Sequence, residues 1–259
     1  MKIHVMSDLH FEHMTHTQLH DFWDRLEERV AGDGVDTVIL AGDIGPLHRG
    51  QLFTNLDGFT SKYKRVFYTP GNHEFFGTSI SRGHELLRDW EGELPRLRLL
   101  LPKRTFVTGS GTVTGGTLWY PDCGDTELKR YWIDYNRVSD GDPEFHVEHQ
   151  KFLQHMPGDI VVSHHFPTNE SVAPAWRGSS TNCFFSADID SRLETWKEQR
   201  VLPKLWIHGH SHSPMDYVSR FGFRVYSNPL GYPYEGANPG FWDRISLELN
   251  FYEEHSLNR

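Results

Sequence analysis

Short apolar runs alternate with amphipathic stretches along most of the chain. The runs KIHVMS, DTVILA, KRVFYT, DIVVS and KLWIH are rich in β-branched or aromatic residues and have the length of buried strands. Helical spacing of apolar residues predicts a helix over residues 15–30, for which Thr15 is a suitable N-cap. The apolar face of this helix carries Leu19, Phe22, Trp23, Leu26 and Val30. Similar patterns predict helices near residues 79–90, 142–155 and 188–200.

The remaining segments have β or loop character. Residues 97–120 contain several short β-type runs broken by glycines, which predicts hairpins at a sheet edge or in a second sheet. The tail returns to β patterning in MDYVS, FRVYS and WDRISLELNFY. We find no internal repeat and no Gly/Ser-rich linker, so residues 1–259 are interpreted as one domain with an α/β architecture built on layered sheets.

Composition narrows the class of protein. The chain has 259 residues, of which 35 are acidic and 26 are basic, so the formal net charge is −9. Such a charge disfavours generic binding to nucleic acid or anionic membranes, because both require a basic face. No apolar run approaches the ~20 residues of a transmembrane helix. These features predict no membrane association and give no strong indication of a nucleic-acid partner; they leave the oligomeric state open.

Cysteine and histidine usage point to the compartment and to the chemistry. The two cysteines, Cys123 and Cys183, are too few for a disulfide framework, and the N-terminal MKIHVMSD has no long apolar segment of the kind found in signal peptides. Both observations predict a cytoplasmic location. The 17 histidines are several times the ordinary number for this length and favour a search for metal ligands or proton carriers.

Potential metal ligands follow five of the apolar runs. Because ligands gather at the carboxyl ends of strands in α/β folds, these side chains are expected to form one site. They are Asp8, His10, Asp43, Asn72, His73, His164, His165, His210 and His212. Three glycines, at positions 42, 71 and 209, precede candidate ligands and are expected to allow sharp backbone turns there.

The ligand types restrict the cofactor. Carboxylate, amide and imidazole groups without a thiolate suit Mn²⁺, Fe or Zn²⁺ better than Ca²⁺ or an iron–sulfur cluster. About seven donors are too many for one ion, but they suit two divalent ions roughly 3.5–4 Å apart that share a carboxylate. The sequence therefore predicts a dinuclear metal site.

The motifs DLH, GD, GNHE, a histidine after an apolar strand, and GHSH occur in this order between Asp8 and His212. Together they resemble the five blocks of the calcineurin-like metallophosphoesterase superfamily. The fold that this resemblance implies is two packed mixed β-sheets flanked by helices, a four-layer α-β-β-α sandwich. Two further stretches, WIDYNR (residues 132–137) and SNPLGYP (residues 227–233), are similar to segments of small bacterial members.

The resemblance also implies roles for individual residues. Asp8 and His10 resemble ligands of the first metal, Asp43 the bridging carboxylate, and Asn72 a ligand of the second metal. His73 resembles the catalytic histidine that stabilises or protonates the leaving group, and His210 and His212 complete the two sets of ligands. In SHHFP either His164 or His165 could be the fourth-block ligand, and we favour His164 because it directly follows the VVS strand. Glu74 is expected to orient a ligand or His73.

The implied function is hydrolysis of a small soluble phosphomonoester or phosphodiester by attack of a metal-bridging hydroxide. Two alternatives are a nuclease of the same superfamily, which the net acidity disfavours, and a non-catalytic metal-binding scaffold, which the complete motif set disfavours. No residue is assigned to substrate binding. Residues 166–187, which include Trp176 and Phe185, either form a lid that stacks a ring of the substrate or an ordinary surface loop.

Overall fold

The first of two β-sheets combines four strands from the N-terminal part of the chain with one strand from near the end of the described residues. The computed structural model describes residues 2–139, 141–236 and 238–249. Four strands of this sheet are parallel and the fifth is antiparallel, in the order β11-β1-β2-β3-β4. Their bounds are Lys2–Met6 (β1), Thr37–Ala41 (β2), Arg65–Thr69 (β3), Leu97–Leu99 (β4) and Ser246–Glu248 (β11).

The second sheet has the order β5-β6-β7-β8-β10-β9, with a parallel centre and an antiparallel strand at each edge. Its strands are Thr105–Thr108 (β5), Gly111–Gly116 (β6), Ile160–Ser163 (β7), Leu205–Ile207 (β8), Met215–Val218 (β9) and Arg224–Ser227 (β10). Because the central strands of each sheet are parallel, their carboxyl ends lie at one edge.

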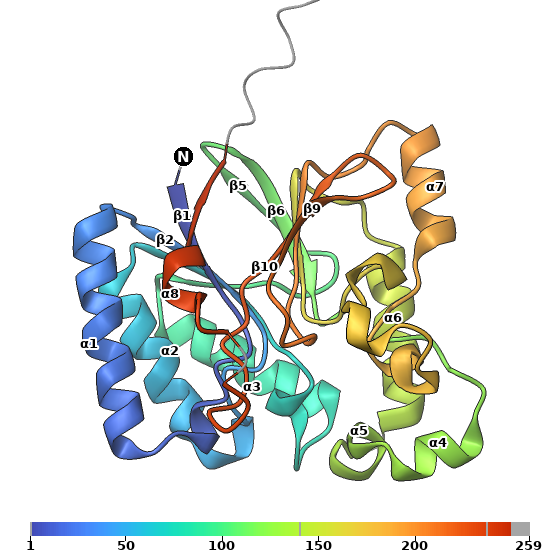
Figure 1. Ribbon diagram of the computed structural model, residues 1–259, viewed down its shortest axis with the longest axis horizontal. Helices are drawn as coiled ribbons and strands as arrows, with labels where there is room; N and C mark the ends of the chain where they lie inside the picture. Colours follow the sequence, from blue (N-terminus) through green and yellow to red (C-terminus); the bar gives the residue numbers. More distant parts are fainter. Residues whose placement is uncertain (1, 140, 237, 250–259) are drawn as a thin grey trace, which may run out of the picture.

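Helices cover the outer face of each sheet (Figure 1). The first sheet packs against His16–Asp33 (α1), Gln51–Lys62 (α2) and Ile80–Glu93 (α3). The second packs against Gly141–Leu153 (α6) and Asp190–Glu198 (α7). Three short helices complete the described chain: Thr126–Tyr131 (α4), Ile133–Arg137 (α5) and Phe241–Arg244 (α8).

Alternating side chains in the strands create three apolar layers. In β2, Val38 and Leu40 face the helices, whereas Ile39 and Ala41 face the other sheet. The inner layer joins the two sheets directly, with Ile3, Val5 and Phe67 on one side and Val113, Ile160, Val162 and Ile207 on the other. The predicted arrangement of two mixed sheets flanked by helices is confirmed.

Several predicted elements differ in the structure. Residues 97–120 do not form hairpins alone, because β4 extends the first sheet in parallel and only β5 and β6 pair as a hairpin. The alternation in WDRISLELNFY is strand only at β11, and its first residues belong to α8; residues 250–252 of this prediction lie outside the described range. The predicted helix over residues 15–30 is α1, and Thr15 forms a capping box with Gln18.

Helix α2 was not predicted, since its sequence QLFTNLDGFTSK contains weak helix formers, including Gly58. The structure explains this glycine by packing: a Cβ at position 58 would lie 2.9 Å from the ring of Trp23 in α1. Gly58 therefore permits a close approach of α1 and α2 at a helix-propensity cost of about 1 kcal/mol. The stabilisation that α2 gains by packing against α1 cannot be inferred from the sequence of α2 alone, which is why this helix was not predicted.

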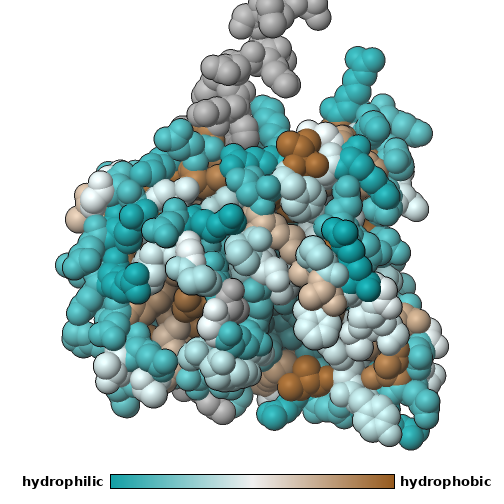
Figure 2. Space-filling view, viewed as in Figure 1, coloured by the Kyte–Doolittle hydropathy of each residue, from teal (hydrophilic) through white to brown (hydrophobic). Residues whose placement is uncertain are grey.

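Hydrophilic side chains cover most of the face shown in Figure 2, where apolar side chains form small separate groups. Among the described residues, no helix combines the length and the apolar character needed to cross a membrane.

Asp33 lies at the C-terminus of α1 and links this helix to strands β1 and β11 of the first sheet. Its carboxylate accepts hydrogen bonds from Lys2 and His4 of β1, both at 3.0 Å, and from Ser246 of β11 at 2.6 Å. Burial alone would raise the pKa of Asp33, but these donors outweigh it and hold the pKa well below its usual value. Burial lowers the pKa of His4.

We expect Asp33→Asn to lower the free energy of unfolding at pH 7 by about 2 kcal/mol, because it weakens three hydrogen bonds to a charged acceptor. In the wild type the pKa values of His4 and Asp33 are lower in the folded chain than in the unfolded chain. The unfolded chain therefore binds more protons at His4 below about pH 6.5 and at Asp33 below about pH 4. The free energy of unfolding falls as the pH drops through these two ranges. Urea unfolding between pH 7 and pH 3.5 measures both effects. Asp24→Asn, at an exposed position of α1, is the control and is expected to change stability by less than ~0.5 kcal/mol; equal losses in the two variants would contradict the role of Asp33.

Candidate metal centre

All the predicted ligands except His165 face one another where the carboxyl ends of the parallel strands of the two sheets meet. Asp8 and His10 follow β1, Asp43 follows β2, and Asn72 and His73 follow β3. His164 follows β7 in the second sheet, and His210 and His212 follow β8. Most of these side chains are buried, and the two most accessible, His73 and His212, are only 13% and 18% exposed.

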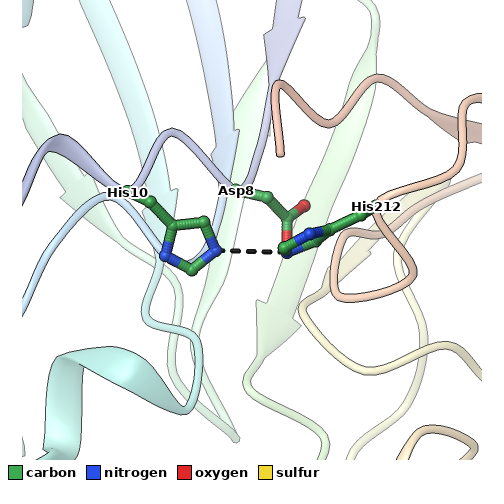
Figure 3. A group of neighbouring side chains, drawn as sticks. All are labelled: Asp8, His10 and His212. Carbon is green, nitrogen blue, oxygen red and sulfur yellow. Dashed lines mark hydrogen bonds and ion pairs between the residues drawn. The ribbon is translucent and has the colours of Figure 1, made fainter. Parts of the chain in front are cut away.

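Asp8, His10 and His212 form the first group of converging candidate metal ligands (Figure 3). The Nε2 atoms of His10 and His212 face each other at 3.2 Å, and His212 Nε2 lies 3.5 Å from Asp8 Oδ1. Asp8 Oδ1 also accepts the backbone N–H of His210, which ties the β1 and β8 loops together.

Asp43, Asn72, His164 and His210 form the second group. His164 Nε2 lies 3.3 Å from Asp43 Oδ2 and 3.0 Å from Asn72 Oδ1, and His210 has a ring nitrogen within reach of the same place. Asp43 Oδ2 is also 3.7 Å from His10 Nε2, which belongs to the first group. One carboxylate oxygen therefore stands between the two groups of ligands.

The backbone at the site is strained. Five candidate ligands have positive φ angles, between 45° and 67°, a region that non-glycine residues seldom occupy. They are Asp8, His10, Asp43, His210 and His212, and they account for five of the nine such residues in the described chain. Each costs of order 1–3 kcal/mol, and clustering of such strain is typical of functional sites.

The glycines beside the ligands serve two different purposes. Gly42 has a φ of 88°, as expected for a sharp turn. Gly71 and Gly209 do not have positive φ, so they do not serve a left-handed turn as Gly42 does. Instead, a Cβ at position 71 would collide with the Asp43 carboxylate, and one at position 209 would lie 2.7 Å from Asp8 Oδ2. Absence of a side chain lets these loops approach the carboxylates closely.

Oxygen acceptors outside the site hold the imidazole rings. Glu12 accepts from His10 Nδ1 at 3.3 Å, and Glu235 accepts from His212 Nδ1 at 2.8 Å. The carbonyl of Ala41 accepts from His164 Nδ1 at 2.9 Å. A neutral imidazole whose Nδ1–H donates a hydrogen bond has a lone pair on Nε2 that can bind a metal ion. Metal-binding histidines typically have an oxygen acceptor at their other nitrogen in this way. Neither Glu12 nor Glu235 was predicted.

The chemistry of the converging atoms suits a cation. With Nδ1 of His10 and of His212 donating outwards, the two Nε2 lone pairs face each other with no proton between them. Asp8 Oδ2 is buried and has no hydrogen-bond partner among the described residues. The Nδ2–H of Asn72 donates to Asp134 at 2.8 Å, so the amide oxygen Oδ1 faces His164. This oxygen adds an amide acceptor to the carboxylate and imidazole acceptors. Lone pairs that face one another without a proton between them are the arrangement that a divalent ion satisfies.

His73 lies beside these groups and contacts residues that the sequence analysis missed. Its Nδ1 is 3.5 Å from Glu12 Oε1, and its Nε2 is 3.1 Å from the hydroxyl of Tyr232. Burial alone would lower the pKa of His73, but the carboxylates of Asp43 and Glu12 outweigh it and raise the pKa to about 9. The two carboxylates therefore favour the protonated imidazole, the form that can donate a proton.

Tyr232 covers the first group of ligands. The centroid of its ring is 4.2 Å from that of His10 and 4.7 Å from that of His212. Tyr232 lies in the SNPLGYP stretch and Asp134 in WIDYNR, so the sequence marked both segments without identifying either residue.

Glu74 was expected to orient a ligand or His73, and the structure favours the first. Its buried carboxylate accepts the backbone N–H groups of Asp43, Ile44 and Gly71 at 2.7–3.0 Å, which fixes the loop that carries Asp43. Burial and the charge of Asp43 raise the pKa of Glu74 to about 7.

The neighbouring histidines are placed differently. His165 points its Nδ1 at the carbonyl of Thr117 and packs against Trp119 and Tyr120, away from Asn72 and Asp43. Burial lowers its pKa to about 3. The ring of His165 also packs against that of His210 at 4.3 Å. Of the two histidines in SHHFP, His164 is the one whose Nε2 faces Asp43 and Asn72.

Buried imidazoles and carboxylates at the strand ends of a double-sheet fold define a metal-dependent hydrolase site. The model of the calcineurin-like phosphoesterase family matches residues 1–214. The uncharacterized protein L509 of Acanthamoeba polyphaga mimivirus is 22% identical over 274 residues, which cover 91% of this chain and 93% of L509. The structure of the phosphopantetheinyl hydrolase PptH from Mycobacterium tuberculosis is similar with a TM-score of 0.65 and 17% identity, covering 93% of this chain and 94% of PptH.

The chain belongs to the calcineurin-like phosphoesterase family. It is therefore a metal-dependent phosphoric ester hydrolase, and the family resemblance found in the motifs is confirmed. The similarity to PptH, at 17% identity, extends the agreement to the whole fold.

Proposed function

We propose that the protein is a dinuclear phosphoesterase that hydrolyses a small soluble phosphomonoester or phosphodiester. The observation that carries the proposal is the position of Asp43, whose Oδ2 lies 3.7 Å from His10 Nε2 and 3.3 Å from His164 Nε2. A carboxylate between two groups of ligands is suited to bridge two ions. Asp8, His10 and His212 would hold one ion, and Asn72, His164 and His210 the other.

Divalent ions in such a site activate a water molecule for attack on phosphorus and neutralise charge that develops on the phosphorus oxygens. Their charge also makes the centre attractive to a phosphate although the protein as a whole carries −9. The side chains present suit Mn²⁺, Fe or Zn²⁺, as predicted from the sequence. The identity of the metals and a cytoplasmic location stay predictions.

His73 is the candidate catalytic residue. It is 13% exposed beside the ligands, and its backbone N–H donates to Asp43 Oδ1 at 3.0 Å, which ties its position to the candidate bridge. Glu12 lies at its Nδ1, so Nε2 is the nitrogen available to the substrate once the hydroxyl of Tyr232 moves aside. From there it would donate a proton to the leaving oxygen or stabilise its charge.

The test is hydrolysis of p-nitrophenyl phosphate and bis-p-nitrophenyl phosphate by metal-stripped protein before and after addition of Mn²⁺. We expect turnover only after addition, with metal analysis giving two ions per chain at saturation. The ratio of the two rates decides between monoesterase and diesterase activity. A single ion at full activity would overturn the dinuclear proposal, and activity without metal would overturn the use of this centre.

A further inference from the structure

An apolar pocket of about 160 Å³ opens beside the candidate metal centre. Most of its wall comes from the loop over residues 166–187, which folds into three short 3-10 helices between β7 and α7. Trp132 and Ser211 complete the wall from other parts of the chain. The loop is therefore packed against the site and is not an open surface excursion.

Three parts of the pocket wall adjoin the candidate metal centre. Ser211 stands between His210 and His212 in the chain. The ring of Phe185 lies 4.6 Å from the ring of His210. Trp132 donates its indole N–H to Asp134 at 3.1 Å, and the same carboxylate holds the amide of Asn72. A phosphate bound at the ligands therefore has this pocket next to it.

The walls are flat and uncharged. Trp132, Phe166, Trp176 and Phe185 contribute aromatic rings, and none of the described residues that line the pocket is charged. Trp132 is held in place by a stacked contact with Phe184 at 4.5 Å and an edge contact with Phe185 at 5.4 Å. An apolar cavity of about 150 Å³ is large enough for a benzene molecule, so this pocket has room for a ring.

Trp176 stands at the rim of the pocket. Its side chain is 65% exposed, although an indole is among the most costly side chains to leave in water. Asn182 donates its amide to the Trp176 carbonyl at 2.9 Å and so fixes the turn that carries the indole. An exposed but positioned indole at the mouth of a ring-sized pocket is suited to cover a bound ring.

We propose that this pocket binds an uncharged planar ring carried by the organic part of the phosphoester, so that the substrates are phosphoesters of aryl or heteroaromatic compounds. This inference rests on the proposed function, since it assigns the substrate class of the same centre. The metal ions would match the charge of the phosphate and the apolar walls would contact the ring, which divides recognition between two adjoining regions.

The first experiment compares kcat/KM for 1-naphthylmethyl phosphate, adenosine 5′-monophosphate and methyl phosphate, which all release an alkoxide, in the Mn²⁺-loaded protein, and for their methyl diesters if the protein is a diesterase. We expect the two ring-bearing esters, or one of them, to be preferred over the methyl ester. Trp176→Ser should reduce this preference by about tenfold, a usual loss for one stacked ring. Ala173→Phe, which fills the pocket, should reduce it further. Tyr131→Ser changes an exposed aromatic residue outside the pocket and is the control.

The second experiment separates this inference from the proposed function, because it requires neither metal nor hydrolysis. Binding of 2-naphthol and of adenosine to the metal-free protein is measured by calorimetry. We expect the wild type and Tyr131→Ser to bind at least one of them, and Trp176→Ser and Ala173→Phe to bind about tenfold more weakly. Binding of naphthol alone assigns an aryl substrate, and binding of adenosine alone assigns a heteroaromatic one.

The outcomes are distinct. Ring binding by a protein that hydrolyses no phosphoester would leave the pocket assignment intact and contradict the proposed function. Hydrolysis with no preference for ring-bearing esters, or with the same preference in wild type, Trp176→Ser and Ala173→Phe, would overturn the pocket assignment while the phosphoesterase function stands.

Discussion

Asp43→Asn is expected to reduce turnover by about 10³-fold or more and to lower the metal content from the proposed two ions per chain to one or none. Asp43 Oδ2 lies between the two groups of ligands, so the neutral amide removes the charge that both ions would share. Loss of several kcal/mol of metal-derived stabilisation corresponds to a rate change of this size. Elemental analysis and steady-state kinetics at saturating Mn²⁺ measure the two effects.

The substitution is nearly isosteric, so the fold should persist. An amide oxygen in place of Asp43 Oδ1 can still accept the backbone N–H of His73. Asp36→Asn is the matched control, because Asp36 precedes β2 and Asp43 follows it, yet Asp36 is far along the strand from the ligands and is partly exposed. Normal metal content and normal turnover in Asp43→Asn would exclude a bridging role.

Most of the candidate ligands could be predicted from the sequence, because each of them follows an apolar strand closely along the chain. Asp43 lies two residues after a mostly apolar strand, and the parallel direction of such strands sends their carboxyl ends to one edge. His164 could be favoured over His165 by the same kind of reasoning, from its place next to the VVS run. The two-sheet arrangement came from the family resemblance, since periodicity alone does not determine which strands pair.

The residues that hold the ligands could not be predicted, because their contacts depend on the tertiary fold. Glu235 reaches His212 across 23 positions of sequence, and Asp134 reaches Asn72 across 62. Glu12 is only two positions from His10, yet its approach to His73 results from the 3-10 turn over residues 11–13. A carboxylate beside a histidine motif is common, and nothing local distinguishes a partner of a ligand from a solvated side chain.

Hydrogen bonds between the loops of the site hold its backbone in an unfavourable conformation. The positive φ angles of Asp8, His10 and Asp43 are unfavourable on their own and must be imposed by the surroundings. Backbone hydrogen bonds between these loops, including His10 N–H to the Asp43 carbonyl at 3.0 Å, provide part of that restraint. Glu74 adds to it by gathering the N–H groups of the Asp43 loop in a buried position. The loops are thus arranged for the ligands before any ion binds, which lowers the reorganisation that binding requires.

His73→Gln is expected to lower kcat by about 10²–10⁴-fold, the usual contribution of a positioned proton donor, while the protein keeps both ions. His73 contacts Asp43 and Glu12 but belongs to neither of the two groups of ligands described above, and the two carboxylates raise its pKa to about 9. Elemental analysis is expected to show unchanged metal content. His20→Gln, on the exposed face of α1, is the control for loss of an imidazole.

The dependence of this loss on the leaving group decides which of the two roles His73 has. A p-nitrophenolate leaves readily without a proton, whereas an alkoxide does not, so a proton donor matters more for the alkyl ester. If His73 protonates the leaving oxygen, His73→Gln should impair hydrolysis of an alkyl phosphoester at least tenfold more than that of the p-nitrophenyl ester. An equal loss on both esters would assign His73 to electrostatic stabilisation of the phosphorus oxygens. An unchanged rate on the alkyl ester would remove His73 from the reaction altogether.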